Sequence, residues 1–373
     1  MSRDPAADLR RIAFLLERSR QPTYRVRAFR TAAARVDELD PSELAERAAA
    51  GTLQELPGIG AATAQAIAES LAGTAPSYLA KAEASGSAPE ATAGAALRAA
   101  LRGDLHTHSE WSDGGSPILE MAVAGRDLGH DYMALTDHSP RLTVARGLSA
   151  ERLEEQLDVV ADVNRQLAPF RLLTGIEVDI LDDGALDQSD ELLARLDVVV
   201  ASVHSKLRMP AAQMTPRMVA AVANPHTDIL GHCTGRMVGS DHSSRTGRPD
   251  HENSGDPHDR HGRDGRPESE FDADIVFEAC ASFGVAVEVN SRPERLDPPK
   301  RLLRQALERG CLVSVDTDAH APGQLEWQPY GCDRLADCGG DAASVVNTWS
   351  VDDLLAWTAD HDHRPGVPAR TPR

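Results

Sequence analysis

Short apolar runs alternate with amphipathic stretches of helical length over most of the chain, starting at Gly103. Near-continuous apolar strands that alternate with helices are typical of a parallel sheet covered by helices. Seven such units predict an α/β barrel, whose site would lie at the carboxyl ends of the strands. The apolar runs are 103–106, 132–136, 171–180, 196–204, 228–232, 285–290 and 312–317. The helical stretches are 116–128, 150–167, 187–195, 213–223, 271–283 and 299–309.

Six of the seven runs end in, or lead into, a side chain of the kind that binds metal ions. Imidazole and carboxylate groups together form the ligand set for zinc, manganese and iron. Because three protein groups are enough to hold one ion, nine in order along the chain suggest a cluster of ions. The nine candidates are His106, His108, Asp113, His138, Glu177, His204, His232, Asp318 and His320.

Two local patterns support this metal hypothesis. His106 and His108 are two residues apart at a strand end, so their rings share one side of the strand. Glu177 lies inside an apolar strand, where a carboxylate is costly unless it is paired or metal-bound. Asp137, next to His138, suits a role in orienting its neighbours. Any one of these residues alone is more often structural, but nine at strand ends together favour a metal site.

The rest of the chain divides by composition. Residues 1–85 have apolar positions at helical spacing and predict a small all-helical domain. Residues 86–101 resemble a linker, which leaves 102–359 for the barrel. Within the barrel, 239–270 contains no hydrophobic residue and predicts a disordered insertion. The tail, 360–373, has a similar composition and the same prediction.

Charge and cysteine content limit the class of protein. The net charge is −19, yet residues 1–85 carry 11 basic and 11 acidic side chains, so the acidity belongs to the rest of the chain. Five scattered cysteines without a Cys-x-x-Cys pair fit free thiols in a reducing cytosol. No apolar run approaches the roughly 18–20 residues of a membrane span, and the N-terminus has no signal-peptide pattern. We expect a cytoplasmic protein with no membrane partner.

The N-terminal region carries a second motif, LQELPGIG at 53–60, followed by a helical Ala-rich stretch. Such a turn can direct backbone N–H groups and a helix N-terminus at a DNA phosphate. The alternative is an ordinary Pro-Gly turn between two helices. The motif therefore predicts a helix-hairpin-helix that binds DNA. The candidate DNA-binding residues are Gly58, Ile59 and Gly60, with positive charge from Arg25, Arg27 and Arg30.

Residues 103–359 resemble the PHP (polymerase and histidinol phosphatase) family, and in particular the PHP domain of bacterial family-X DNA polymerases. The insertion at 239–270 and Cys233, where relatives commonly have proline, are departures that remove no ligand. The resemblance implies a distorted seven-stranded (β/α)7 barrel. The matching stretches are DLHTH (104–108), SDG (112–114), LTDH (135–138), GIEVD (175–179), SVH (202–204), GH (231–232), TGR (234–236), EVN (288–290), DTDAH (316–320) and VNTW (346–349).

By the same resemblance the site would hold three divalent ions, Mn²⁺ or Zn²⁺ or else Fe²⁺. His106, His108, Glu177 and Asp318 would hold the first ion. The second would be held by Asp113, His138 and His320, and the third by Glu177, His204 and His232, with Glu177 bridging.

Catalytic roles are expected for Asp318, His320 and Arg236. Arg236 is a candidate for phosphate contact and Arg292 another, each with a surface salt bridge as the alternative. Trp111 could stack on a terminal base, although simple packing is the commoner role for such a residue.

Residues 5–83 are similar to the small N-terminal domain of family-X polymerases. Some relatives use lysines on the helix after the hairpin for lyase chemistry, but here that helix, 61–68, has none. The stretch from residue 86 to His106 is also too short for a polymerase palm. The chain thus resembles the two ends of a family-X polymerase without the polymerase between them.

The function predicted from these features is hydrolysis of phosphodiester or phosphomonoester bonds at DNA ends or gaps by a metal-activated hydroxide. This activity would be a 3′–5′ exonuclease or 3′-end processing in DNA repair. The first alternative is a phosphatase for a small phosphomonoester, such as histidinol phosphate or a nucleotide. The second is a non-catalytic DNA-binding scaffold.

Overall fold

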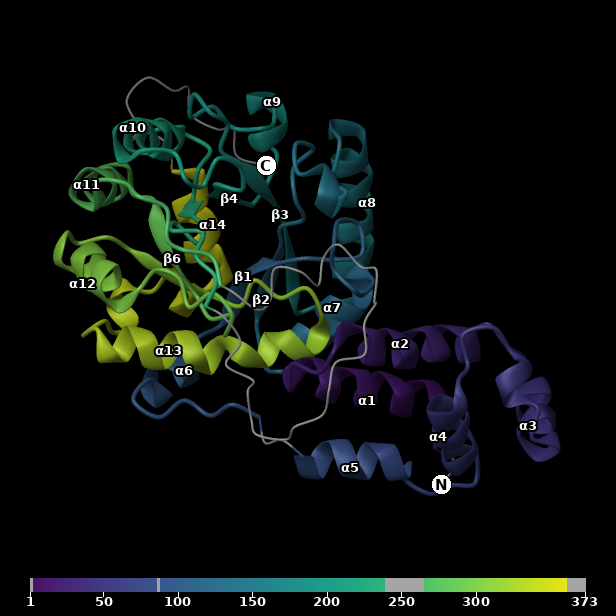
Figure 1. Cartoon of the computed structure of the whole chain (residues 1–373). Coiled ribbons are helices and arrows are strands. Elements are labelled where there is room, and N and C mark those ends of the chain that lie inside the picture. The colour runs from purple at the N-terminus through teal and green to yellow at the C-terminus, as the bar shows by residue number, and fades with distance from the viewer. Residues whose placement is uncertain (1–2, 86–87, 239–264, 361–373) are drawn as a thin grey trace. The chain divides into compact units, whose positions relative to one another are not determined.

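The computed structural model of the chain describes residues 3–85, 88–238 and 265–360 (Figure 1). These residues form two compact units, one with the chain up to Pro89 and Ala321–Glu326, the other with the remainder from Glu90 onward. The predicted insertion at 239–270 lies mostly outside the described residues, and so does nearly all of the predicted tail at 360–373. Helix α6 (Ala95–Ala100) falls inside the predicted linker. The domain boundaries taken from the sequence stay predictions.

Seven parallel strands follow one another around the second unit in chain order, β1 to β7. Each forms where an apolar run was recognised in the sequence, so the predicted seven-stranded α/β barrel is confirmed. The strands are β1 (Gly103–Thr107), β2 (Tyr132–Leu135), β3 (Arg171–Asp179), β4 (Val198–Ser202), β5 (Ile229–Leu230), β6 (Ala286–Asn290) and β7 (Val313–Asp316).

Side chains join the first and last strands and nearly close the barrel. Asp316 Oδ1 accepts a hydrogen bond from the backbone N–H of Leu105 (2.8 Å). On the other strand, Asp104 Oδ2 accepts from Thr317 Oγ1 (2.5 Å). These two fully buried carboxylates occupy the place of ladder bonds between β1 and β7, so the strand ends are held in a ring.

Helices surround the strands on the outside of the barrel (Figure 1). Their apolar residues share a core with the strands, as Met214, Met218 and Phe277 do with Val199 and Ala201. All six helical stretches expected from the sequence contain a helix, although α9 is only one turn long. The helices are α7 (Ile118–Asp127), α8 (Ala150–Leu167), α9 (Asp190–Leu193), α10 (Ala211–Val222), α11 (Ala273–Phe283), α12 (Lys300–Glu308), α13 (Gln328–Asp337) and α14 (Val351–Ala359).

The first unit is helical, as predicted. Asp4 caps the first helix by accepting from the N–H groups of Ala6 and Ala7. Leu9, Ile12 and other apolar residues at helical spacing form its core with residues from the later helices. The helices are α1 (Pro5–Arg18), α2 (Thr23–Asp37), α3 (Pro41–Ala50), α4 (Ala61–Leu71) and α5 (Ser77–Ser85).

The structure bears on two expectations from the sequence, the free cysteine thiols and the absence of a membrane span. All five cysteines are free thiols, and four of them are buried. Among the described residues, no helix combines the length and the apolarity that a membrane span needs.

Candidate metal centre

All nine predicted ligands meet at the carboxyl ends of the strands. His106 belongs to β1 and Glu177 to β3, where a backbone bridge between His138 and Glu177 extends the pairing of β2 with β3. The remaining candidate ligands lie in the segments that follow β1, β2, β4, β5 and β7. Because these strands are arranged in one ring, the segments after them bring the ligands together. The Asp113 side chain is 37 % exposed and is the most exposed member of the group, followed by His320 at 17 % and His204 at 12 %.

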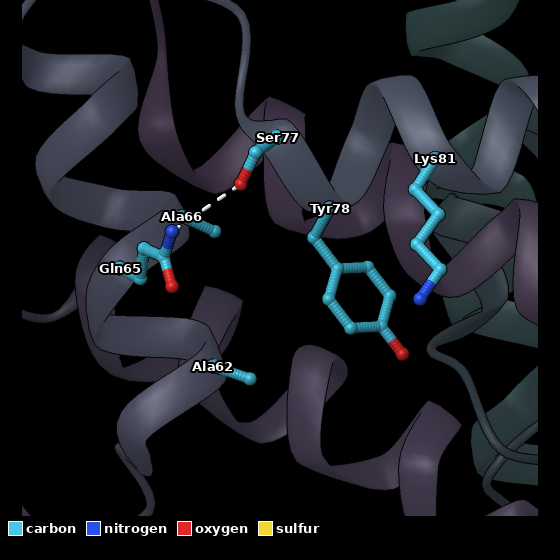
Figure 2. Close-up of a pocket in the computed structure, with 6 residues that line it drawn as sticks. All are labelled: Ala62, Gln65, Ala66, Ser77, Tyr78 and Lys81. Carbon is cyan, nitrogen blue, oxygen red and sulfur yellow. Dashed lines mark hydrogen bonds between the residues drawn. The ribbon is translucent and has the colours of Figure 1, made fainter.

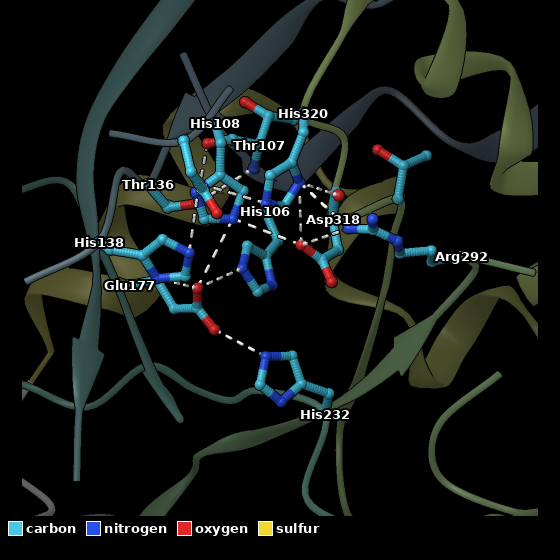
Figure 3. A network of polar contacts seen from close by, with 12 residues as sticks. His106, Thr107, His108, Thr136, His138, Glu177, His232, Arg292, Asp318 and His320 are labelled. Carbon is cyan, nitrogen blue, oxygen red and sulfur yellow. Dashed lines mark hydrogen bonds and ion pairs between the residues drawn. The ribbon is translucent and has the colours of Figure 1, made fainter. Parts of the chain in front are cut away.

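Glu177 is the centre of this group (Figure 3). Its Oε2 lies 2.8 Å from His138 Nδ1 and 3.4 Å from His106 Nε2. On its other oxygen, Oε1 lies 2.8 Å from His232 Nε2 and 3.2 Å from His204 Nε2. One buried carboxylate therefore faces imidazoles from four different parts of the barrel.

A second focus forms around Asp113 and Asp318. Asp113 Oδ1 lies 3.5 Å from His138 Nε2 and 3.4 Å from His320 Nε2. Asp318 Oδ1 lies 3.4 Å from His108 Nε2. These separations are longer than good hydrogen bonds, and they leave room between the facing atoms.

Three overlapping sets of these atoms lie close enough together to hold metal ions. They agree with the predicted sets in part: His108 joins the group around Asp113, and His138 stands with Glu177 where His232 was expected. The exact ligand sets therefore stay a prediction. The sets are His108, Asp113, His138 and His320; His106, His108 and Glu177; and His138, Glu177 and His204.

Buried nitrogen atoms without hydrogen-bond partners show that the donor set fits metal ions. Both ring nitrogens of His108, His106 Nε2 and His232 Nδ1 are buried and make no hydrogen bond of good geometry. A polar atom buried without a partner is costly, so native proteins rarely leave several together. Divalent ions between these lone pairs would satisfy them.

Burial and charge set the protonation of the histidines in opposite ways. Burial, with help from His320 and His138, lowers the pKa of His108 to about 3. Burial also lowers the pKa of His232 to about 3, with Arg295 nearby. Burial alone would lower the pKa of His204 as well, but Glu177 raises it to about 9. The neutral His108 and His232 thus already present lone pairs at neutral pH, whereas His204 would lose a proton on metal binding.

Asp137 positions the loop that carries Asp113, as its place beside His138 predicted. Its carboxylate accepts hydrogen bonds from Ser109 N (2.8 Å), Ser109 Oγ (2.6 Å) and Ser112 Oγ (2.5 Å). A fourth bond comes from Gln156 Nε2 on α8 (2.7 Å). All four of these bonds come from the supporting loop and helix, so Asp137 acts on the cluster by holding that loop in place.

Two arginines reach the cluster, and one of them, Arg292, was a candidate from the sequence. Arg292 Nη1 lies 3.3 Å from His320 Nδ1 and 3.9 Å from Asp318 Oδ1. Arg295 Nε lies 2.9 Å from Asp318 Oδ2, and its side chain is mostly buried. No sequence pattern pointed to Arg295, because its position depends on the path of the loop after β6.

Among the described residues, Arg236 binds neighbouring backbone carbonyls and Trp111 packs against the core. Arg236 Nε donates to the carbonyl of Arg295 (3.0 Å), and its Nη2 donates to the carbonyl of Leu296. Its Nη1 lies 3.6 Å from Glu268 Oε1, so the catalytic role expected for Arg236 stays a prediction. Trp111 packs against the apolar core of the barrel, which was the alternative considered for it.

In the N-terminal unit, the predicted hairpin is a short turn that leads into helix α4. Gly58 has a φ of +84°, and a side chain there would also meet Thr31 Cγ2 at 2.6 Å, so only glycine fits. Ile59 is buried and anchors the turn. The N–H of Gly60 donates to Thr63 Oγ1 (2.9 Å) at the start of α4. The turn thus has the tight geometry that the sequence predicted.

The three predicted DNA-binding arginines differ in their surroundings. Arg30 Nε lies 2.6 Å from Glu17 Oε1, and both side chains are mostly buried. Arg25 lies beside the exposed Tyr24 ring, at 5.9 Å from its centroid. Arg27 is exposed on the same helix. Arg30 therefore has a structural task, whereas Arg25 and Arg27 face solvent.

A shallow pocket separates α4 from α5 in the same unit (Figure 2). Ala62, Gln65 and Ala66 line it from α4, and Gln65 Nε2 donates to Ser77 Oγ (3.3 Å). Lys81 on α5 lines its other side, next to Tyr78. The α4 face is made of alanine and glutamine, in agreement with the lysine-free helix noted in the sequence.

Comparisons with known proteins match both units. The helix-hairpin-helix domain family matches residues 3–74, and the PHP domain family matches 104–291. The chain is 36 % identical over 262 residues to the DNA polymerase/3′–5′ exonuclease PolX of Bacillus subtilis. That match covers 70 % of this chain and 42 % of the polymerase, so the chain spans less than half of that relative's length.

Two further proteins match about two thirds of the chain. A protein named "Probable phosphatase" from Caldanaerobacter subterraneus subsp. tengcongensis is 26 % identical over 276 residues, with 70 % of this chain and 93 % of that protein covered. Among solved structures, histidinol phosphate phosphatase from Lactococcus lactis, in complex with zinc, L-histidinol and phosphate, matches with a TM-score of 0.40 and 15 % identity. It covers 65 % of this chain and 95 % of that one. With the family match over half of its length, the chain belongs to the PHP domain family and carries a helix-hairpin-helix domain before the barrel.

Proposed function

We propose that this protein is a metal-dependent phosphate ester hydrolase that acts on DNA ends. The observation that carries the proposal is the group of nine histidines and carboxylates at one end of the barrel, with buried nitrogen atoms that have no hydrogen-bond partner. Divalent ions bound there would neutralise phosphate oxygens and make water nucleophilic at neutral pH. The naming of two relatives as an exonuclease and a probable phosphatase supports this class of reaction.

The chain's own residues would hold and orient the phosphate group. Arg292 lies beside His320 and Asp318 with its guanidinium toward the cluster (Figure 3), so it is placed to pair with a phosphate oxygen. Arg295 neutralises Asp318 from the opposite oxygen and fixes that carboxylate. Without cations, the carboxylates of this group would repel a phosphate ester.

The N-terminal unit supports DNA as the substrate. A helix-hairpin-helix turn presents backbone N–H groups, and the exposed Arg25 and Arg27 add positive charge on α2. A hydrolase of small phosphate esters has no use for such a unit. We therefore infer that the unit binds DNA and that the barrel removes nucleotides or a phosphate from the 3′ end.

A 3′-labelled oligonucleotide incubated with Mn²⁺ and the full-length protein tests this activity. We expect loss of the label, and no loss with the variants His106→Ala and Asp318→Ala. The matched control is His361→Ala, a histidine outside the described residues, which should behave as the wild type. Full activity of either cluster variant would contradict the site assignment.

The rival function is a phosphatase for a small phosphomonoester, and the coverage of a probable phosphatase over 93 % of its length favours it. Deletion of residues 1–85 separates the two functions. If the rival holds, turnover of every substrate is unchanged; if DNA ends are the substrate, hydrolysis of long DNA falls while that of p-nitrophenyl phosphate persists. Metal analysis that found no bindable ions would favour a non-catalytic scaffold instead.

A further inference from the structure

Strand β6 contributes none of the nine candidate ligands, yet its central carboxylate lies against two of them. Glu288 is fully buried and is absent from the three sets of groups close enough to hold an ion. We propose that Glu288 is a positioning residue, which fixes His106 and His232 in the orientation that metal binding requires. The inference rests on the proposed metal-dependent function of this site.

The contact with His106 determines which ring nitrogen faces the cluster. Glu288 Oε1 lies 2.7 Å from His106 Nδ1. An ionised carboxylate only accepts hydrogen bonds, so Nδ1 carries the proton and donates it. A metal ion would then bind at the other nitrogen, Nε2, which points at Glu177 Oε2 across 3.4 Å. A ligating histidine held in this way by a carboxylate has a fixed ring and a more basic free nitrogen.

The second oxygen of Glu288 reaches a different strand. Its Oε2 accepts from the backbone N–H of His232 (2.5 Å), just after β5. The His232 ring then places Nε2 at 2.8 Å from Glu177 Oε1. Asn290 Nδ2 lies 3.4 Å from each Glu288 oxygen and 3.2 Å from Asp318 Oδ2. One carboxylate therefore ties ligands from β1 and β5 to the same centre, Glu177.

The two contacts make Glu288→Gln a sharp test, because glutamine cannot replace both. Its single carbonyl oxygen can accept from His106 Nδ1–H or from His232 N–H, and its NH₂ group then meets the other donor. The matched control is Asp228→Asn, an equally buried carboxylate at the amino end of β5 that accepts from Val199 N (2.8 Å).

The measurement is a Zn²⁺ titration of the metal-free full-length protein against a chromophoric chelator. We expect Glu288→Gln to bind at least one ion roughly 10- to 100-fold more weakly, and Asp228→Asn to match the wild type. The loss should shrink in a His106→Ala background, since part of the effect passes through that ring. Wild-type affinity in Glu288→Gln, or an equal loss with and without His106, would overturn the proposal.

A second measurement needs no Glu288 variant, in case that variant does not fold. In the Zn²⁺-loaded wild type, ¹⁵N-histidine NMR reports which ring nitrogen of His106 carries the proton, with the signal assigned by its loss in His106→Ala. We expect a proton on Nδ1 and the ion on Nε2, and the opposite arrangement would refute the role of Glu288. Both readouts are independent of hydrolysis, so an inactive enzyme with normal Zn²⁺ binding would count against the proposed function alone.

Discussion

The barrel's candidate site and the N-terminal unit's candidate DNA surface are built in opposite ways. In the barrel, side chains on or just after six strands converge at one end, and Glu177, only 1 % exposed, faces five imidazoles. In the N-terminal unit, the candidate residues are a glycine turn and arginines on a helix surface. Buried charge must be compensated, so its presence says much about function, whereas an exposed arginine has many uses.

The arginines of α2 illustrate that difference. Arg27 and Arg30 are both arginines on α2, three residues apart. Arg30 is paired with the buried Glu17, whereas Arg27 is exposed. In the barrel, by contrast, every histidine predicted as a ligand joins the cluster. Four predictions test whether buried charged groups matter more than exposed ones in this protein. They are ordered from the largest expected effect to the smallest.

The largest effect should come from Glu177→Gln in the barrel. The change removes the negative charge that faces five of the candidate histidines, so the ions would lose their common ligand. We expect hydrolysis to fall at least about 100-fold, since even loss of an outer partner of a metal ligand costs up to about that much. Two quantities are measured: the rate of hydrolysis at saturating Mn²⁺ and the number of metal ions bound per protein molecule. The surface carboxylate variant Glu154→Gln is the control, and a near-normal rate in Glu177→Gln would break the comparison.

Much of the barrel could be predicted from the sequence because its pattern is physically forced. A parallel strand covered on both faces must be apolar, so all seven strands were recognisable, and ligands after strand ends had to share one rim. Helices α13 and α14 were not predicted. The segment of α13, with Pro329 and Gly331 inside it, has weak helical propensity and depends on packing against the barrel.

The supporting residues of the site show where such reasoning stops. Glu288 could have been found by the rule that identified Glu177, since it too is a lone carboxylate in an apolar strand. Arg295 could not, because only the folded loop brings it to Asp318. The sequence also could not show which of Arg27 and Arg30 forms a buried ion pair. The partner of Arg30, Glu17, lies 13 residues away on another helix.

The second largest effect should be on stability, from Arg30→Ala. Its removal leaves the Glu17 carboxylate, 2 % exposed, without the guanidinium 2.6 Å away. We expect the free energy of unfolding of the N-terminal unit to fall by about 2–3 kcal/mol, toward the range for breaking a buried ion pair. Chemical denaturation measures it. A stable Arg30→Ala protein with much weaker DNA binding would instead place Arg30 in the DNA surface.

The third prediction concerns pH and separates the two units, because residues 1–89 contain no histidine. In the barrel, burial lowers the pKa of His130 to about 4. As pH falls below about 6.5, the unfolded chain takes up this proton first, so stability is lost between about pH 6.5 and 4. From pH 8 to 5.5 the loss from this group should be about 1.4 kcal/mol.

His130→Gln should remove that part of the pH dependence. The comparison is between the slopes of unfolding free energy against pH in wild type and variant, so any constant loss of packing cancels. The control is His361→Gln, which should keep the wild-type slope. Equal slopes in wild type and His130→Gln would show that His130 is not held neutral by burial.

The smallest effect should come from Arg27→Ala, the exposed counterpart of Arg30. If its guanidinium contacts one DNA phosphate, its loss removes about one released counterion on binding. The slope of log affinity against log salt should then become shallower by about 0.9, and duplex DNA should bind roughly three- to fivefold more weakly near 0.15 M salt. Fluorescence anisotropy across a salt series measures both quantities, while the unfolding free energy should stay within about 0.5 kcal/mol of the wild type. An unchanged salt slope would remove Arg27 from the DNA surface and leave the glycine turn to act without it.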